Sequence, residues 1–160
     1  MIFIIEGQPK GKARPRFTRS GHAYTPRETK NYEEAIACAY KVAGGELLDG
    51  YVAVSVKAFY KIPKATSKKN TELMEQGYIK PLGKPDIDNV LKVVLDGLNK
   101  IAYSDDAQVV SISGEKFYRK EPCIMVEVKQ SEQRGKPLLA LPDENRELPQ
   151  HLQGRQDCKN

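Results

Sequence analysis

Residues 84–89 read Lys-Pro-Asp-Ile-Asp-Asn, and residues 104–108, one predicted helix later, read Ser-Asp-Asp-Ala-Gln. Four carboxylates therefore stand at two neighbouring points of a chain whose net charge is +5. Between these points, apolar residues recur at helical spacing, which predicts a helix from Asp88 to about Ala102 with one buried face. The acidic residues thus flank a helix that packs on a core.

The carboxylates at these two points form a candidate metal site. Residues two apart in an extended segment face the same side, so Asp86 and Asp88 can converge. Carboxylate oxygens suit Mg²⁺, or Mn²⁺, and no neighbouring His or Cys argues for zinc. We interpret Asp86, Asp88 and Asp106, with Asp105 as a further candidate, as ligands of an ion that serves phosphodiester hydrolysis. Lys92, one turn after Asp88, is positioned to place an ammonium beside the same phosphate.

Each acidic pair also has a simpler explanation. An Asp before a helix is often a cap, and Asp-Asp after a helix often makes a turn. A shared ion further requires the strand that begins at Gln108 to start beside the segment carrying Asp86, which the spacing does not establish. The basic surroundings and the aligned lysine favour a metal site. The alternative, that these aspartates only cap a helix or form a turn, stays open.

Positive charge is concentrated in two regions that are predicted to be loops. Residues 7–30 contain seven Lys or Arg and one acid, and residues 57–69 contain five Lys and no acid. Arginines and aromatic rings are mixed between positions 14 and 24, which suits phosphates together with unpaired bases, although a solvated loop is the plain alternative. The predicted DNA-contacting residues are Lys10, Lys12, Arg14, Arg16, Arg19, Lys64, Lys68, Lys69 and Lys84.

The remaining pattern predicts an α+β fold, a mixed β-sheet of about four strands with two helices packed on it. The first strand is apolar on both faces and is therefore expected to be central, with the last two strands joined as a hairpin beside it. The long connection at 61–85 is interpreted as a substrate-contacting flap. The predicted strands are 2–6, 51–60, 108–118 and 123–129, and the first helix is 29–43.

Length and composition limit the protein class. The 160 residues predict one domain at 1–130 and a polar, poorly ordered C-terminal tail at 131–160. The apolar runs are too short to span a bilayer, and the N-terminus does not resemble a secretory signal. Three scattered cysteines suggest neither a disulfide framework nor a zinc site. A cytoplasmic protein without membrane association is expected.

The chain resembles the RusA family of Holliday junction resolvases in four segments, at residues 11–17, 84–89, 95–99 and 105–109. The order and spacing match across residues 84–109, which include Leu-Asp-Gly-Leu-Asn at 95–99 and Asp-Asp-Ala-Gln-Val at 105–109. Gly-Lys-Ala-Arg-Pro-Arg-Phe at 11–17 is similar to the phage-type and Gram-positive members. The resemblance covers about residues 1–130.

The resemblance implies a homodimeric, Mg²⁺-dependent endonuclease that resolves four-way DNA junctions by paired symmetric nicks in recombination and repair. By position, Asp86, Asp88 and Asp106 match the family's catalytic carboxylates, and Lys92 matches its active-site lysine. One departure is that Lys84 and a proline stand where the best-known enterobacterial form has arginines. Two other hypotheses remain: a non-catalytic branched-DNA-binding protein, and a nuclease that cuts flaps or replication forks.

Overall fold

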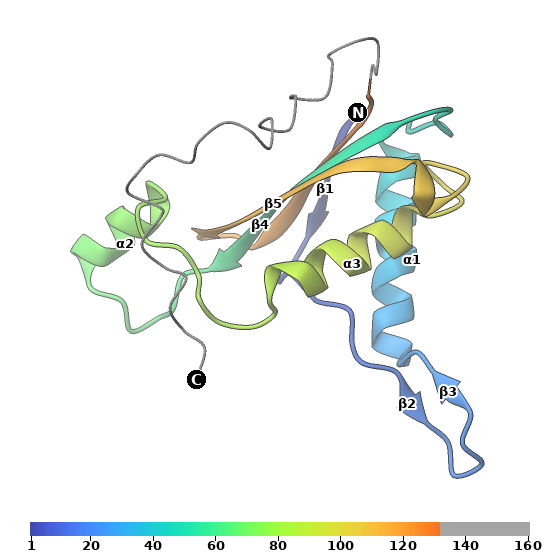
Figure 1. Cartoon of the computed structure of the whole chain (residues 1–160). Coiled ribbons are helices and arrows are strands. Elements are labelled where there is room, and N and C mark those ends of the chain that lie inside the picture. The colour runs from blue at the N-terminus through green and yellow to red at the C-terminus, as the bar shows by residue number, and fades with distance from the viewer. Residues whose placement is uncertain (132–160) are drawn as a thin grey trace, which may run out of the picture.

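The computed structural model describes residues 1–131, so the predicted tail lies, apart from Ser131, outside the described residues. A four-stranded mixed sheet, in the order β1-β6-β4-β5, is covered on one face by α1 and α3 (Figure 1). The predicted α+β fold is therefore confirmed. The sheet strands are β1 (Ile2–Glu6), β4 (Val52–Lys61), β5 (Val109–Arg119) and β6 (Cys123–Gln130), and the covering helices are α1 (Arg27–Val42) and α3 (Ile87–Leu98).

Four shorter elements lie outside this two-layer body. The strands β2 (Arg16–Phe17) and β3 (Ala23–Tyr24) pair as a small hairpin within the segment that was predicted to be a loop. The helix α2 (Lys68–Glu75) lies in the long basic connection, and the 3₁₀ turn η1 (Asp106–Gln108) leads into β5. Among residues 1–131, no helix is both long enough and apolar enough to cross a membrane.

The core lies between α1, α3 and one face of the sheet. Alternate residues of β4 point into it, and Val54 and Val56 are almost fully buried. The two helices pack closely at Gly97, where an added Cβ would come within 2.9 Å of the Glu33 carbonyl oxygen and 3.0 Å of the Ile36 Cβ. This contact fixes α3, and hence both acidic segments, relative to α1.

The prediction that the first strand is central is wrong. β1 pairs only with β6 and forms an edge of the sheet. Phe3 and Ile5 point into the core, whereas Ile2 and Ile4 are 59% and 48% exposed on the opposite face. Because the helices cover only one face, an apolar run here does not mean burial on both faces.

The predicted hairpin of the last two strands is also wrong, because β4 lies between them. β4 runs parallel to β5 and antiparallel to β6. The short link at 120–122 lacks the Asn-Gly or Asp-Gly chemistry of a tight hairpin, and β4 has the fully buried face that a central strand needs. The path from β4 through α3 to β5 is a parallel crossover, so β5 begins beyond the C-terminal end of α3.

Candidate metal and DNA-binding site

Asp86 is the N-cap residue of α3, and its side chain makes no capping hydrogen bond. The sheet holds the preceding residue in place, because the Pro85 carbonyl oxygen accepts from the Tyr60 hydroxyl at 3.1 Å and from the Lys116 ammonium at 3.1 Å. Burial, with smaller effects of Tyr32 and Asp86, raises the pKa of Tyr60 to about 12, so Tyr60 stays a donor at neutral pH. β4 and β5 therefore position a carboxylate that is free to bind.

Asp88 lies in the first turn of α3, where the helix dipole favours a negative charge. The sequence predicted that the helix begins at Asp88, but the helix begins at Ile87 and Asp86 is its N-cap residue. The Oδ2 atom of Asp88 is 3.6 Å from Lys92 Nζ, and its Oδ1 accepts from the Asn89 side chain at 3.2 Å. Both charged side chains are about 60% exposed, so the pair adds little stability, and both groups remain accessible to a substrate.

Asp105 and Asp106 differ in what they do in the fold. Asp105 caps η1 by accepting from the Ala107 N–H at 2.9 Å, while the Gln108 side chain accepts from the Asp105 N–H at 3.1 Å. The hydrogen bond from Ala107 is the main cause that lowers the pKa of Asp105. Asp106 is not the capping residue, which makes it the better ligand candidate, and a ligand role for Asp105 stays a prediction.

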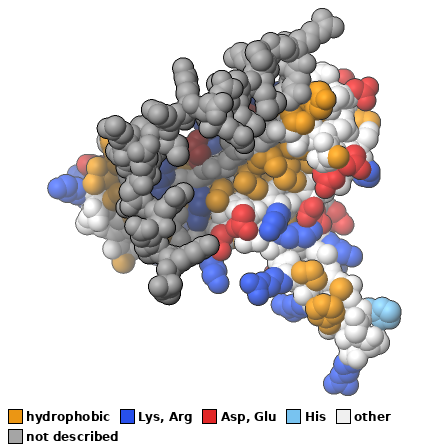
Figure 2. Space-filling view, in the orientation of Figure 1, with side chains coloured by type: hydrophobic (Ala, Val, Ile, Leu, Met, Phe, Trp, Pro, Cys, Tyr) orange, Lys and Arg blue, Asp and Glu red, His pale blue; other side chains and the backbone are white. Residues whose placement is uncertain are grey.

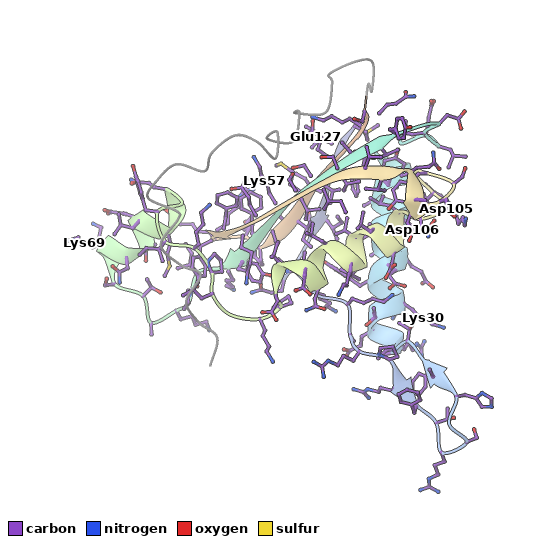
Figure 3. All side chains as sticks on the ribbon, in the orientation of Figure 1. Lys30, Lys57, Lys69, Asp105, Asp106 and Glu127 are labelled. Carbon is purple, nitrogen blue, oxygen red and sulfur yellow. The ribbon has the colours of Figure 1, made fainter. Side chains whose placement is uncertain are left out.

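The two acidic segments lie at opposite ends of α3. The helix has 12 residues, and at about 1.5 Å per residue it is about 18 Å long. Within residues 1–131, no group of three or more His, Cys, Asp or Glu side chains lies close enough to hold a metal ion. Figure 3 shows Asp105 and Asp106 at the start of β5, so one chain does not bring Asp106 to Asp86 and Asp88. The return of the chain beside Asp86, which a site within one chain requires, does not occur.

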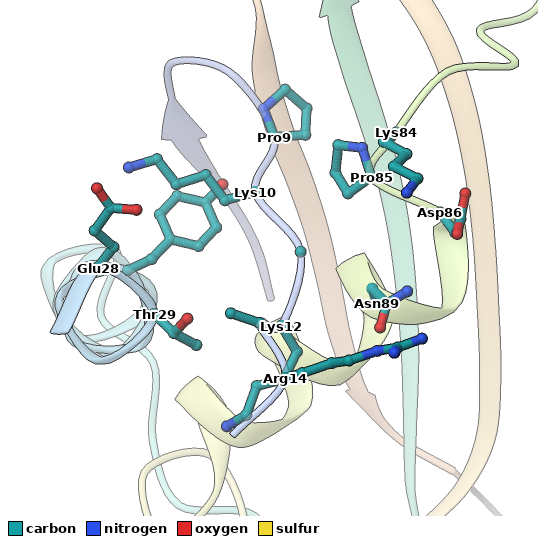
Figure 4. Close-up of a pocket in the computed structure, with 13 residues that line it drawn as sticks. Pro9, Lys10, Lys12, Arg14, Glu28, Thr29, Lys84, Pro85, Asp86 and Asn89 are labelled. Atoms are coloured by element: carbon teal, nitrogen blue, oxygen red, sulfur yellow. The ribbon is translucent and has the colours of Figure 1, made fainter. Parts of the chain in front are cut away.

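A cleft of about 760 Å³ opens beside Asp86, between the segment at 9–14 and the starts of α1 and α3. In Figure 4, Lys84 and Asp86 lie on one side of the cleft and Lys10 on the other, and Arg14 lies below them, beside Asn89. Cations that surround a cleft attract the phosphates of a nucleic-acid strand. Asp86 stands at the margin of this positively charged cleft.

Comparison with known proteins identifies the family of the chain. A family model described as endodeoxyribonuclease RusA matches residues 6–129. The chain belongs to the RusA endodeoxyribonuclease family. The uncharacterized protein YqaN of Bacillus subtilis (strain 168) is 36% identical over 134 residues, which cover 80% of this chain and 94% of YqaN. Membership of the RusA family supports a nuclease that cuts DNA internally.

Lys12 holds the basic segment of this RusA-family chain against both helices. Its ammonium lies 2.5 Å from Glu33 Oε1 on α1 and 2.6 Å from Asp96 Oδ2 on α3, and its backbone N–H donates to the Asn89 carbonyl oxygen at 2.8 Å. Burial lowers the pKa of Lys12, but the bonds to Asp96 and Glu33 outweigh it and the net shift is upward. Two carboxylates neutralise the charge of Lys12, which weakens its attraction for a phosphate. A DNA contact of Lys12 stays a prediction.

The other predicted DNA-contacting residues of the RusA-family domain lie on accessible surface. Arg14, Arg16 and Arg19 are exposed on and beside the β2–β3 hairpin. Figure 2 shows blue side chains gathered over this part of the molecule, next to red ones. In Figure 3, Lys69 on α2 lies at the end of the molecule opposite Asp105 and Asp106. Lys64, Lys68 and Lys69 of the second basic region are also exposed.

Sequence reasoning missed the two residues that hold the carbonyl before Asp86. Tyr60 ends the buried face of β4, and its pattern suggested only a core residue. Lys116 also donates to the Gly83 carbonyl oxygen at 2.5 Å. Lys116 follows Glu115 in a strand with many exposed residues, so its sequence context did not distinguish it from a surface lysine.

Proposed function

We propose that the protein is a structure-selective endodeoxyribonuclease that resolves Holliday junctions by paired symmetric nicks, with Mg²⁺, or Mn²⁺, as cofactor. The observation that carries this proposal is the accessible Asp86 carboxylate at the margin of a basic cleft, in a chain of the RusA family. The proposed catalytic domain is residues 1–130. A DNA substrate is in keeping with the cytoplasmic location that the sequence predicts.

The proposed roles follow from the chemistry of each side chain. Asp86, Asp88 and Asp106 supply the hard oxygen ligands that Mg²⁺ prefers. When bound, the ion lowers the pKa of a water molecule and neutralises charge on the phosphate. Lys92, which faces solvent beside Asp88, stabilises the charge that develops on the phosphate or the leaving oxygen. Lys84 and the other cations of the cleft hold the backbone of the strand.

A homodimer explains why the carboxylates are separated in one chain. β5 is an edge strand, and its Val110 and Ile112 are 42% and 47% exposed beside α3. Two copies that pair through this edge about a two-fold axis place their α3 helices antiparallel. The start of one α3 then lies near the end of the other, so that Asp86 meets Asp106 of the partner subunit. In this dimer each metal site contains residues of both chains.

The proposal is tested on synthetic DNA with and without Mg²⁺. We expect Mg²⁺-dependent, paired nicking of a four-way junction and little or no cutting of linear duplex. Junction binding without nicking at any Mg²⁺ or Mn²⁺ concentration would instead support the non-catalytic branched-DNA-binding protein. Faster cutting of flaps or replication forks than of four-way junctions would support the other nuclease hypothesis.

Junction affinity is expected to fall steeply with salt, because each phosphate neutralised by Lys or Arg releases counterions. If the exposed cations of the cleft and the hairpin make about six phosphate contacts, affinity falls about 10³-fold between 50 and 200 mM salt. Filter binding or fluorescence anisotropy without divalent metal measures this slope. An affinity that does not change with salt would contradict the assignment of these basic regions to DNA binding.

A further inference from the structure

The β2–β3 hairpin extends away from the two-layer body of the protein (Figure 1). Every residue from position 14 to position 24 is exposed. The two strands are two residues long, and Arg16 pairs with Tyr24 while Phe17 pairs with Ala23. A hairpin this small has no core of its own to bury. Its side chains are therefore available for contact with something outside the chain.

Phe17 is 71% exposed on this hairpin, and Tyr24 is 45% exposed. The pairing places Phe17 on the hairpin face opposite to that of Tyr24, because successive residues of a strand face opposite sides. A large aromatic side chain that is exposed to solvent on a protruding element can mark an interaction site. The charges of the neighbouring residues then indicate the kind of partner.

The surroundings of Phe17 point to nucleic acid. Between Gly7 and Arg27 the chain contains six Lys or Arg residues and no acid. Arg14, Arg16 and Arg19 lie within three residues of Phe17 in the sequence and are exposed, as Phe17 is. Guanidinium groups suit phosphates, and a flat aromatic face suits an unstacked base. This charge pattern favours a nucleic acid over an apolar protein surface.

The base of the hairpin is fastened beside the candidate metal site. The Lys12 N–H donates to the Asn89 carbonyl oxygen at 2.8 Å, and an added Cβ at Gly11 would come within 2.8 Å of the Pro85 Cβ. Phe17 is five residues beyond Lys12, and such a segment spans at most about 18 Å. One DNA strand rises about 3.4 Å per base step. Phe17 can therefore reach a base about five steps away from a phosphate that is bound beside Asp86.

We propose that the β2–β3 hairpin recognises the branch point of the DNA, with Phe17 stacked on a base that is unstacked at the crossing. Arg14, Arg16 and Arg19 bind phosphates of the adjoining arms. Linear duplex offers no such base without the cost of unstacking, so the contact favours branched over linear DNA. This inference rests on the proposed function, for which it supplies the element that selects the shape of the substrate.

The test uses four-way junctions with 2-aminopurine at the branch point, in the absence of divalent metal so that binding is measured without cleavage. Binding of the wild-type protein is expected to change the 2-aminopurine fluorescence, and Phe17→Ala is expected to remove this change. Phe17→Ala should also lower the preference for junction over duplex about 10-fold or more, within the range for loss of one stacked base. Phe17→Tyr should keep both properties because it keeps the ring.

Two further variants make the outcome specific. Phe17→Leu keeps an apolar side chain without a flat ring and should behave like Phe17→Ala. Val42→Ala changes a side chain that is 82% exposed at the other end of α1, and should behave like wild type. If Phe17→Ala kept the fluorescence change and the junction preference of the wild-type protein, the proposal would be overturned. Loss of the dimer in this variant would also overturn it, because the hairpin would then be a dimerisation element. Failure of the wild-type protein to cleave with Mg²⁺ would instead refute the proposed function, which this metal-free test does not measure.

Discussion

Asp86→Asn is expected to reduce cleavage of a four-way junction by about 10³-fold or more, because a metal ligand contributes several kcal/mol to the transition state. Asp88→Asn is expected to have a similar effect. Junction binding should persist in both variants, since the cations of the cleft and the hairpin are unchanged. Single-turnover cleavage with Mg²⁺, together with binding measured without metal, separates the two properties.

Glu121→Gln is a suitable control for the removal of one negative charge. Glu121 is exposed in the link between β5 and β6, and we assign it no role in the site. This variant should cleave like wild type. If Asp86→Asn and Asp88→Asn both retained full activity, neither carboxylate would be a ligand of a catalytic metal. If they lost binding together with cleavage, the carboxylates would act in the fold or in DNA binding.

Asp106→Asn is expected to reduce cleavage as strongly as Asp86→Asn, although the two residues lie at opposite ends of α3. The physical reason is that, in the proposed homodimer, Asp106 of one copy and Asp86 of the other would bind the same ion. Loss of Asp106 should therefore also weaken Mn²⁺ binding, measured by titration of the metal alone. The exposed position of Asp106 means that the free energy of unfolding should change little.

Asp105→Asn provides the matched comparison at the neighbouring position. Asparagine is as good an N-cap as aspartate, so the variant can still accept the hydrogen bond from Ala107 that orders η1. We expect a smaller loss of cleavage in Asp105→Asn than in Asp106→Asn. Equal losses would assign a ligand role to both residues, and a larger loss in Asp105→Asn would exchange their assignments.

Local patterns were sufficient to predict the four strands of the sheet and the two helices that cover it, but not the β2–β3 hairpin. The helical spacing of apolar residues predicted α1 and α3, and the alternation along β4 predicted its buried face, where Val54 and Val56 lie. Strand order was not predictable in the same way, because it depends on which strands meet across the sheet. β4 enters between β5 and β6, and the three-residue link between those strands, although it lacks the residues of a tight hairpin, does not indicate which strand separates them.

The candidate site was predictable in its residue types and not in its assembly. Asp86, Asp88 and Lys92 were predicted as site residues because they lie within two helical turns, and their roles stay a prediction. Asp106 depends on the direction of β5, which the crossover through α3 sets. The pairing of Lys12 with two carboxylates was equally hidden, because Glu33 and Asp96 are distant from it in the sequence.

The central claim is that carboxylates from two separate segments, in two copies of the chain, bind one catalytic ion. The most direct test is a heterodimer of Asp86→Asn and Asp106→Asn chains, purified through two different affinity tags and compared with each variant alone. If sites are shared between subunits, one site of the heterodimer has both defects and the other has none. We expect each variant alone to be inactive and the heterodimer to make single nicks in a four-way junction with Mg²⁺. A heterodimer as inactive as its parents would contradict the shared site.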